Sequence, residues 1–188
     1  MDEQKFSLIS DVFSANTMSM LHKHCNIYTT DKSSYAIWPD SVSSTVECFS
    51  HTLTGKDRIT VLYDLCNNAD IPCDVSLLKT SDIAIQKIPP GGSIGRHADN
   101  CHFSLTVFLN DIDQGGEFVW LQGDQKNIVQ PIKNHGIFAY YNGEHTGGAD
   151  HEVNEVKGSV TRYTLQLFVF DKTGTHDNKY RNFNEKED

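Results

Sequence analysis

The hydrophobic pattern of the chain changes near residue 82. Before that point, apolar residues recur three and four positions apart, as they do on one face of a helix. Two such sets predict two helices, the first with Met18, Leu21 and Cys25, the second with Ile59, Leu62, Tyr63 and Cys66. Ser14 or Asn16 can cap the first helix, because a short polar side chain accepts a hydrogen bond from the backbone of the first turn. We expect residues 1–81 to form a helix-containing support layer with a short strand at 34–38.

From residue 82 onward, short apolar runs alternate with clusters of turn residues. Eight runs are typical of strands: 83–88, 96–99, 103–109, 117–121, 128–130, 136–141, 152–156 and 160–170. Strands this short and closely spaced favour an antiparallel sandwich or barrel, which a double-sheet jelly roll closes. We therefore expect a mainly β fold with N-terminal helices (α+β), in which residues 82–171 form a jelly-roll core. The polar stretch 172–188 is an expected surface tail.

Composition predicts one ordinary domain and indicates which classes of partner are not expected. The chain has 188 residues, and 16 basic against 25 acidic residues give a net charge of -9. Without a basic stripe, nucleic acid is not an expected partner. The sequence has neither a signal-peptide pattern nor the roughly 18 apolar residues of a membrane span, so we expect no membrane partner and a cytoplasmic or nuclear location.

The five cysteines lack a Cys-x-x-Cys pair and are expected to be free thiols. The oligomeric state is left open.

A candidate metal site begins at His97 and Asp99. In a strand, residues two apart project from the same face about 6 to 7 Å apart, so an imidazole and a carboxylate can converge on one ion. Two histidines and one carboxylate on one face of an ion are typical of non-haem Fe(II) in oxygenases. The second histidine is either His145, which lies among glycines, or His151, which begins a strand-like run. We favour His151, because metal ligands need rigid support.

A candidate anion site lies at Arg162. Strand alternation places three polar side chains on one face, namely Arg162, Thr164 and Gln166, and the apolar ones on the other, namely Tyr163, Leu165, Leu167 and Val169. The apolar face can pack beneath the N-terminal helices, which leaves the polar face to line the interior of a barrel. A buried arginine needs an anion, because an unpaired buried charge is costly. A planar guanidinium suits a carboxylate ligand, although a structural salt bridge satisfies the same need.

Several motifs occur together and in a fixed order along residues 82–170. They are Pro90-Gly91-Gly92 before His97-x-Asp99, the run 105–110 followed by Gly115-Gly116-Glu117, and His151-x-Val153 before Gly158 and Arg162. As an ordered set they resemble the Fe(II)- and 2-oxoglutarate-dependent dioxygenases, and in particular the prolyl 4-hydroxylase-like branch. The resemblance implies a double-stranded β-helix core in which His97, Asp99 and His151 hold Fe(II). It also implies that Arg162 binds the distal carboxylate of 2-oxoglutarate.

The activity that this resemblance implies is hydroxylation of a C–H bond, with 2-oxoglutarate and O2 consumed and succinate and CO2 released. Ascorbate is a further candidate cofactor. The favoured substrate is a prolyl residue of a protein or peptide. A free amino acid or another small metabolite is the alternative substrate, and a metal-bearing jelly-roll binding module without turnover is the alternative class. Asp99 favours hydroxylation over halogenation, since its carboxylate occupies the position that a halide would need.

Two positions depart from the pattern of the family. The usual tyrosine about nine residues before the first ligand is matched by Ile88, which has no hydroxyl to assist Arg162. Arg162 also lies one residue further from His151 than is usual, and a bulge after Gly158 is the expected accommodation. The first departure affects the expected co-substrate pocket. The second affects only the register of the strand that carries Arg162.

Overall fold

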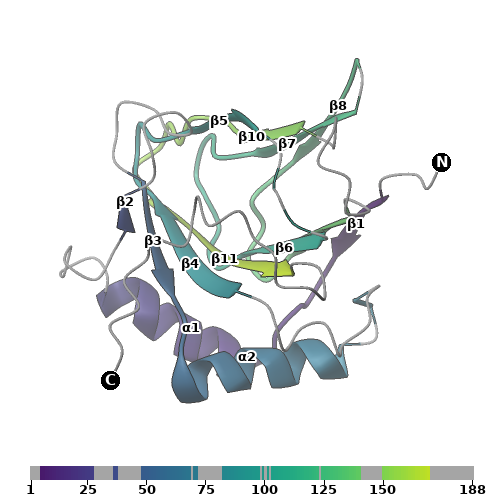
Figure 1. Cartoon of the computed structure of the whole chain (residues 1–188). Helices are drawn as coiled ribbons and strands as arrows, with labels where there is room; N and C mark the ends of the chain where they lie inside the picture. Colours follow the sequence, from purple (N-terminus) through teal and green to yellow (C-terminus); the bar gives the residue numbers. More distant parts are fainter. Residues whose placement is uncertain are drawn as a thin grey trace.

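Two antiparallel β-sheets lie one above the other, and two helices cover the outer face of the larger sheet (Figure 1). This computed structural model describes residues 5–27, 36–37, 48–68, 70–71, 82–97, 99, 101, 103–122, 124–140 and 150–169. The predicted tail at 172–188, Cys73 and His145 lie outside the described residues. No helix among the described residues is long and apolar enough to cross a membrane.

The larger sheet has seven strands and the smaller has four. In spatial order, the larger sheet contains β1 (Lys5–Ile9), β9 (Gly136–Tyr140), β6 (Phe103–Phe108), β11 (Arg162–Val169), β4 (Asp82–Ile88), β3 (Phe49–Thr52) and β2 (Ala36–Ile37). The smaller sheet contains β5 (Ile94–His97), β10 (Asp150–Val153), β7 (Phe118–Gln122) and β8 (Gln125–Val129). The helices are α1 (Ala15–Ile27) and α2 (Gly55–Asn67).

Each of the eight predicted runs after residue 82 overlaps a strand, which confirms the jelly-roll prediction. Several boundaries differ from those expected. β8 begins at Gln125 instead of 128, β10 ends at Val153 instead of 156, and β11 begins at Arg162 instead of 160. The regular strand ends at Val153. Beyond it, Asn154 N–H still donates to Glu117 O, and Val156 forms only an isolated bridge with Gly115.

The N-terminal part contributes more than the helical support layer that its sequence predicts. β1 adds to the edge of the larger sheet beside β9, and β3 adds to it beside β4. The strand β1 was not predicted at all. The larger sheet is therefore completed on both sides by residues that precede the jelly-roll core.

Helix α1 agrees with its prediction. The hydroxyl of Ser14 accepts a hydrogen bond from the backbone N–H of Thr17 at 3.3 Å, which is the bond of an N-cap. Met18, Leu21 and Cys25 are all buried. The four cysteines in the described part of the chain are not joined by disulfides.

Helix α2 is present, but the predicted buried face was wrong. Ile59 and Tyr63 are 64% and 70% exposed, whereas Val61 and Leu65 are fully buried. The buried face differs from the predicted one because two carboxylates of α2 form polar contacts with residues of α1 and of the turn that precedes it. Asp64 accepts a hydrogen bond from Ser14 N at 2.8 Å, and Asp57 lies 2.7 Å from His24 Nε2. Asp57, Val61, Asp64 and Leu65 follow helical spacing, so this mixed stripe faces α1.

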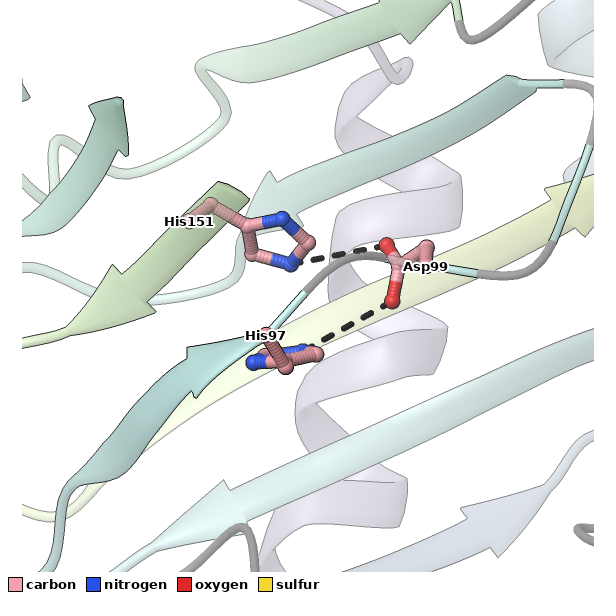
Figure 2. Close-up of side chains that lie close together, drawn as sticks. All are labelled: His97, Asp99 and His151. Carbon is pink, nitrogen blue, oxygen red and sulfur yellow. Dashed lines mark ion pairs between the residues drawn. The ribbon is translucent and has the colours of Figure 1, made fainter. Parts of the chain in front are cut away.

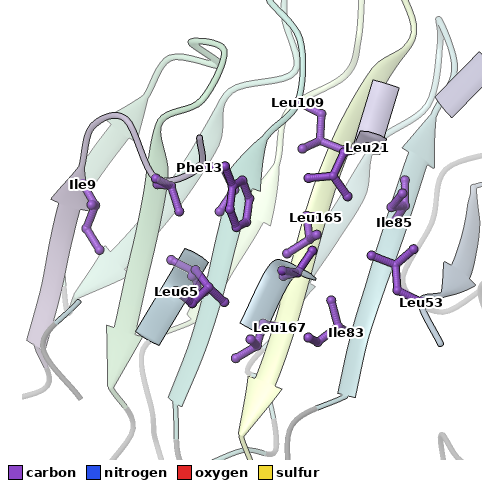
Figure 3. Packing of buried hydrophobic residues seen from close by; sticks show 14 of the residues in the cluster. Ile9, Phe13, Leu21, Leu53, Leu65, Ile83, Ile85, Leu109, Leu165 and Leu167 are labelled. Atoms are coloured by element: carbon purple, nitrogen blue, oxygen red, sulfur yellow. The ribbon is translucent and has the colours of Figure 1, made fainter. Parts of the chain in front are cut away.

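The main hydrophobic core lies between the helices and the larger sheet (Figure 3). Leu165 and Leu167 of β11 pack there with Leu21 of α1 and Leu65 of α2, as the alternation of β11 predicts. A second cluster lies between the two sheets and includes Phe108, Phe118 and Trp120. The opposite face of β11 is thereby turned toward the space between the sheets, where the candidate site residues gather.

Candidate metal centre and anion site

The three predicted metal ligands meet at the inner face of the smaller sheet (Figure 2). His97 ends β5 and lies directly opposite His151 of β10 in the antiparallel register. Asp99 follows two residues after His97 and points its carboxylate at both rings. His97 Nε2 lies 3.6 Å from Asp99 Oδ1, and His151 Nε2 lies 3.5 Å from Asp99 Oδ2.

The spacing of these atoms suits a single ion. One ligand atom from each of the three residues lies within 4.8 Å of the others. Two ligand atoms held about 2.1 Å from one ion and at right angles to each other lie about 3 Å apart, close to the separations found here. Side-chain exposure of 19% for His97, 17% for Asp99 and 6% for His151 leaves one side of the group accessible. The donor set of two imidazoles and one carboxylate is the set that non-haem Fe(II) accepts.

Neighbouring groups fix the two imidazole rings in orientations that suit metal binding. His97 Nδ1 lies 2.8 Å from Gly95 O, and because a carbonyl oxygen only accepts, Nδ1 carries the hydrogen. The neutral ring therefore keeps its lone pair on Nε2, the atom that faces Asp99. The His151 ring stacks on Phe118 at 5.1 Å between centroids and lies nearly parallel to Trp120 at 6.2 Å. Such support outside the ligand set holds metal ligands in place.

Arg162 is completely buried, and no carboxylate among the described residues pairs with it. Its Nε donates to Gly116 O at 3.0 Å and its Nη1 donates to Gln86 Oε1 at 3.3 Å. Its Nη2 is buried and has no acceptor within the part of the chain that the structure describes. The guanidinium carbon lies 5.2 Å from the centre of the Phe108 ring. Burial lowers the pKa of Arg162 to about 9, an effect that a bound anion would oppose.

Ile88 lies opposite Arg162 in the β4–β11 register, so an apolar side chain occupies the expected tyrosine position. The nearest polar group on β4 is Gln86, two residues earlier and on the same face. Gln86 is fully buried, and its Oε1 accepts hydrogen bonds from Arg162, Thr164 and Gln166. The sequence analysis missed Gln86, although a glutamine within the apolar run 83–88 and on the face of Ile88 was a detectable signal.

A small cavity beside the metal group is linked to Arg162 through Gln166 and Gln86. The cavity lies between the sheets and is lined by His97, Asp99 and His151, and from the opposite sheet by Thr106, Gln166 and Phe168. Gln166 in turn donates to Gln86 Oε1 at 3.1 Å, and Gln86 contacts Arg162. Gln166 therefore links the cavity beside the metal group to the buried guanidinium.

The extra residue before Arg162 lies outside the sheet. Residues 158–160 form a bend, and the Asp113 carboxylate accepts hydrogen bonds from Ser159 N at 3.1 Å and Ser159 Oγ at 3.3 Å. These bonds hold the pKa of Asp113 below its usual value. The accommodation is thus a bend that precedes β11, and not a bulge within it.

Comparison with known proteins bears on the fold. No protein-family description matches the sequence, and no curated protein matches it. Solved structures do match. A prolyl-4-hydroxylase from Pseudomonas putida is 16% identical, with a TM-score of 0.66 over 89% of this chain and 94% of that one. A Trichoplax adhaerens prolyl hydroxylase, in complex with a peptide fragment of the hypoxia inducible factor oxygen degradation domain, is 14% identical, with a TM-score of 0.66 over 89% and 84%.

A third similar structure contains the expected co-substrate. The viral collagen prolyl hydroxylase from Paramecium Bursaria Chlorella virus-1, in a 2-oxoglutarate complex, is 13% identical, with a TM-score of 0.60 over 89% of this chain and 97% of that one. The chain thus has the double-stranded β-helix fold of the 2-oxoglutarate and Fe(II) oxygenases. Within that fold its similarity extends to prolyl 4-hydroxylases, which confirms the resemblance found in the sequence at the level of architecture. At such low identity the chemistry has to be argued from the site.

Proposed function

We propose that this protein is an Fe(II)- and 2-oxoglutarate-dependent hydroxylase. One observation carries the proposal. A group of two histidines and one carboxylate borders a small cavity, and hydrogen bonds from Gln166 through Gln86 link this cavity to a buried arginine with no acidic partner among the described residues. A metal group alone fits a structural ion, and a buried arginine alone fits many folds. The two together match a ligand that chelates metal at one end and carries a carboxylate at the other.

In this proposal each residue of the site has a defined task. His97, Asp99 and His151 would hold the metal, each through one atom. Bound there, Fe(II) would supply O2 activation coupled to the oxidative decarboxylation of 2-oxoglutarate to succinate and CO2. Arg162 pairs with the distal carboxylate and so orients the keto-acid end toward the metal.

The lining of the cavity places apolar side chains around the metal group. Ile94, Phe118 and Val153 from the smaller sheet and Phe168 from the larger sheet surround the three ligands with apolar surface. A dry pocket limits side reactions of a reactive oxidant and strengthens the charge pairing of the co-substrate. The stacked ring of Phe118 combines this role with the support of His151.

The proposed substrate is a prolyl residue of a protein or peptide. Its support is the likeness to prolyl hydroxylases, including one that holds a peptide. A search for the substrate would incubate the protein with Fe(II), 2-oxoglutarate and a library of proline-containing peptides. Mass spectrometry would then detect products that have gained one oxygen atom. Turnover with a free amino acid and with no peptide would instead select the small-molecule alternative.

The metal assignment is tested with two histidine variants. His151→Ala should lose tight iron binding after anaerobic reconstitution, together with succinate formation from 2-oxoglutarate. His145→Ala is the matched control and should retain its metal, since our proposal assigns His145 no ligand role. Metal content and succinate yield are measured for both variants and the parent chain. Metal lost from His145→Ala and kept by His151→Ala would contradict the ligand set.

A further inference from the structure

The inner face of the larger sheet carries a cluster of hydrogen-bond donors with too few acceptors. Three donors converge on one atom, Gln86 Oε1: Arg162 Nη1 at 3.3 Å, Thr164 Oγ1 at 3.3 Å and Gln166 Nε2 at 3.1 Å. A carbonyl oxygen has two lone pairs, so this acceptor is fully used. The cluster also holds the positive charge of Arg162.

Arg162 determines the orientation of the Gln86 amide, because a guanidinium can only donate hydrogen bonds, whereas the Thr164 hydroxyl and the Gln166 amide can also accept. A rotation that exchanged the oxygen and nitrogen of Gln86 would place an NH2 group against Arg162 Nη1 and remove the acceptor of that donor. The amide nitrogen Nε2 is therefore assigned by its surroundings. It is buried and, within the described part of the chain, has no acceptor.

Two buried donor groups thus lack acceptors in adjacent side chains. They are Gln86 Nε2 and Arg162 Nη2, and their side chains are joined by the Nη1–Oε1 hydrogen bond. Leaving such groups unsatisfied costs free energy, and native proteins satisfy nearly all of them. A ligand that brings two acceptor atoms and a negative charge removes the deficit, and a carboxylate has both properties.

We propose that Gln86 donates a hydrogen bond from Nε2 to the distal carboxylate of 2-oxoglutarate, beside Arg162, and so supplies the donor that Ile88 cannot. This inference rests on the proposed function and names a residue for one end of its co-substrate. Gln86 is a binding residue in this account, because it touches the ligand directly. It also positions Arg162, because its Oε1 holds Nη1 and leaves Nη2 available for the carboxylate.

A charge substitution separates this role from a structural one. Gln86→Glu keeps the acceptor for Arg162 but removes the Nε2 donor and pairs the guanidinium with an internal carboxylate. The melting temperature of the ligand-free protein should therefore rise, while the affinity for 2-oxoglutarate should fall about tenfold or more. If Gln86 had only a structural role, the substitution would cause no loss of affinity for 2-oxoglutarate. Gln86→Met, which removes the donor without adding charge, should also weaken binding about tenfold.

Binding is measured by thermal shift with Mn(II) under anaerobic conditions, so that no turnover is needed. Two probes are compared: 2-oxoglutarate, and 2-oxobutanoate, which has the chelating end but no distal carboxylate. The substitutions at Gln86 should reduce the shift with 2-oxoglutarate and leave the smaller shift with 2-oxobutanoate unchanged. Gln125→Glu on β8 is the control, because it makes the same charge change at an exposed position and should alter neither shift.

The outcomes distinguish this inference from the proposed function. If either Gln86 variant binds 2-oxoglutarate as tightly as the parent chain, Gln86 is not a donor to the carboxylate and the inference is overturned. If the parent chain shows no metal-dependent shift with either keto acid, the proposed function itself fails. A loss of both shifts in both variants while the parent chain keeps them would also overturn the inference, because the effect would not be specific to the distal carboxylate.

Discussion

Replacing Arg162 with methionine tests the anion site most directly. Methionine keeps much of the length of the side chain but removes the charge and every hydrogen-bond donor. The parent arginine is completely buried and donates to Gly116 O and Gln86 Oε1, while its Nη2 has no acceptor in the described structure. The substitution therefore removes two hydrogen bonds from the ligand-free protein. It also removes the free-energy cost of an unpaired buried charge. Because replacement of buried charges by apolar groups is often neutral, we expect the free energy of unfolding to change by only about 1 kcal/mol.

The effect on co-substrate binding should be much larger. Hydrogen bonds to charged groups contribute about 1.5 to 3 kcal/mol each, and a guanidinium can form two with one carboxylate. The loss of both predicts about 3 kcal/mol or more, which is roughly a hundredfold rise in the Kd of 2-oxoglutarate. Metal affinity should stay nearly constant, since Arg162 is not one of the three proposed ligands.

Isothermal titration of the Mn(II)-loaded protein measures the Kd of 2-oxoglutarate, and titration of the metal-free protein with Mn(II) measures the metal affinity. Lys157→Met is the control, since Lys157 is the next cation in sequence that could receive an anion. Lys157 is exposed and lies in a groove with Glu117 and Glu155, whose charges oppose anion binding. An unchanged Kd in Arg162→Met, or a hundredfold loss in Lys157→Met, would refute the assignment of the anion site.

Two further predictions concern stability. Leu165→Ala should lower the free energy of unfolding by about 2 to 5 kcal/mol, because Leu165 is fully buried between β11 and the helices. Urea denaturation measures this value, and a change below about 0.5 kcal/mol would show that the helices do not pack there. Gly158→Ala should lower the melting temperature, because the Asp113 carboxylate occupies the position of an added Cβ. An unchanged melting temperature in Gly158→Ala would mean that Asp113 does not hold the bend at 158–160.

The candidate metal group was predictable because each part of it follows a local rule. His97 and Asp99 share a face through strand alternation, and His151 begins a regular run that could hold a ligand rigidly. The structure brings the three side chains together, with His97 and His151 opposite each other on adjacent strands. Likewise, the alternation of residues 162–169 placed Arg162 in the interior and Leu165 in the core.

The parts that could not be predicted depend on contacts between distant segments. The proposed role of Gln86 depends on its hydrogen bonds with Arg162, Thr164 and Gln166, which are at least 76 residues away along the chain. The buried face of α2 was mispredicted because Asp64 finds a partner in Ser14, 50 residues earlier. Hydrophobic periodicity treats such acidic residues as solvent-facing, so it cannot detect a stripe in which carboxylates point inward.

The position of β1 at the edge of the larger sheet has a consequence for how the protein is made. Among the described strands, β1 pairs only with β9, and about 130 residues separate the paired positions of the two strands. At ribosomal speeds of about 5 to 20 residues per second, β1 emerges on the order of ten seconds before its partner exists. Throughout that interval its backbone groups are open to chaperones or to a strand of another chain. Correct folding of the nascent chain therefore depends on an N-terminal segment whose pairing is completed late in synthesis.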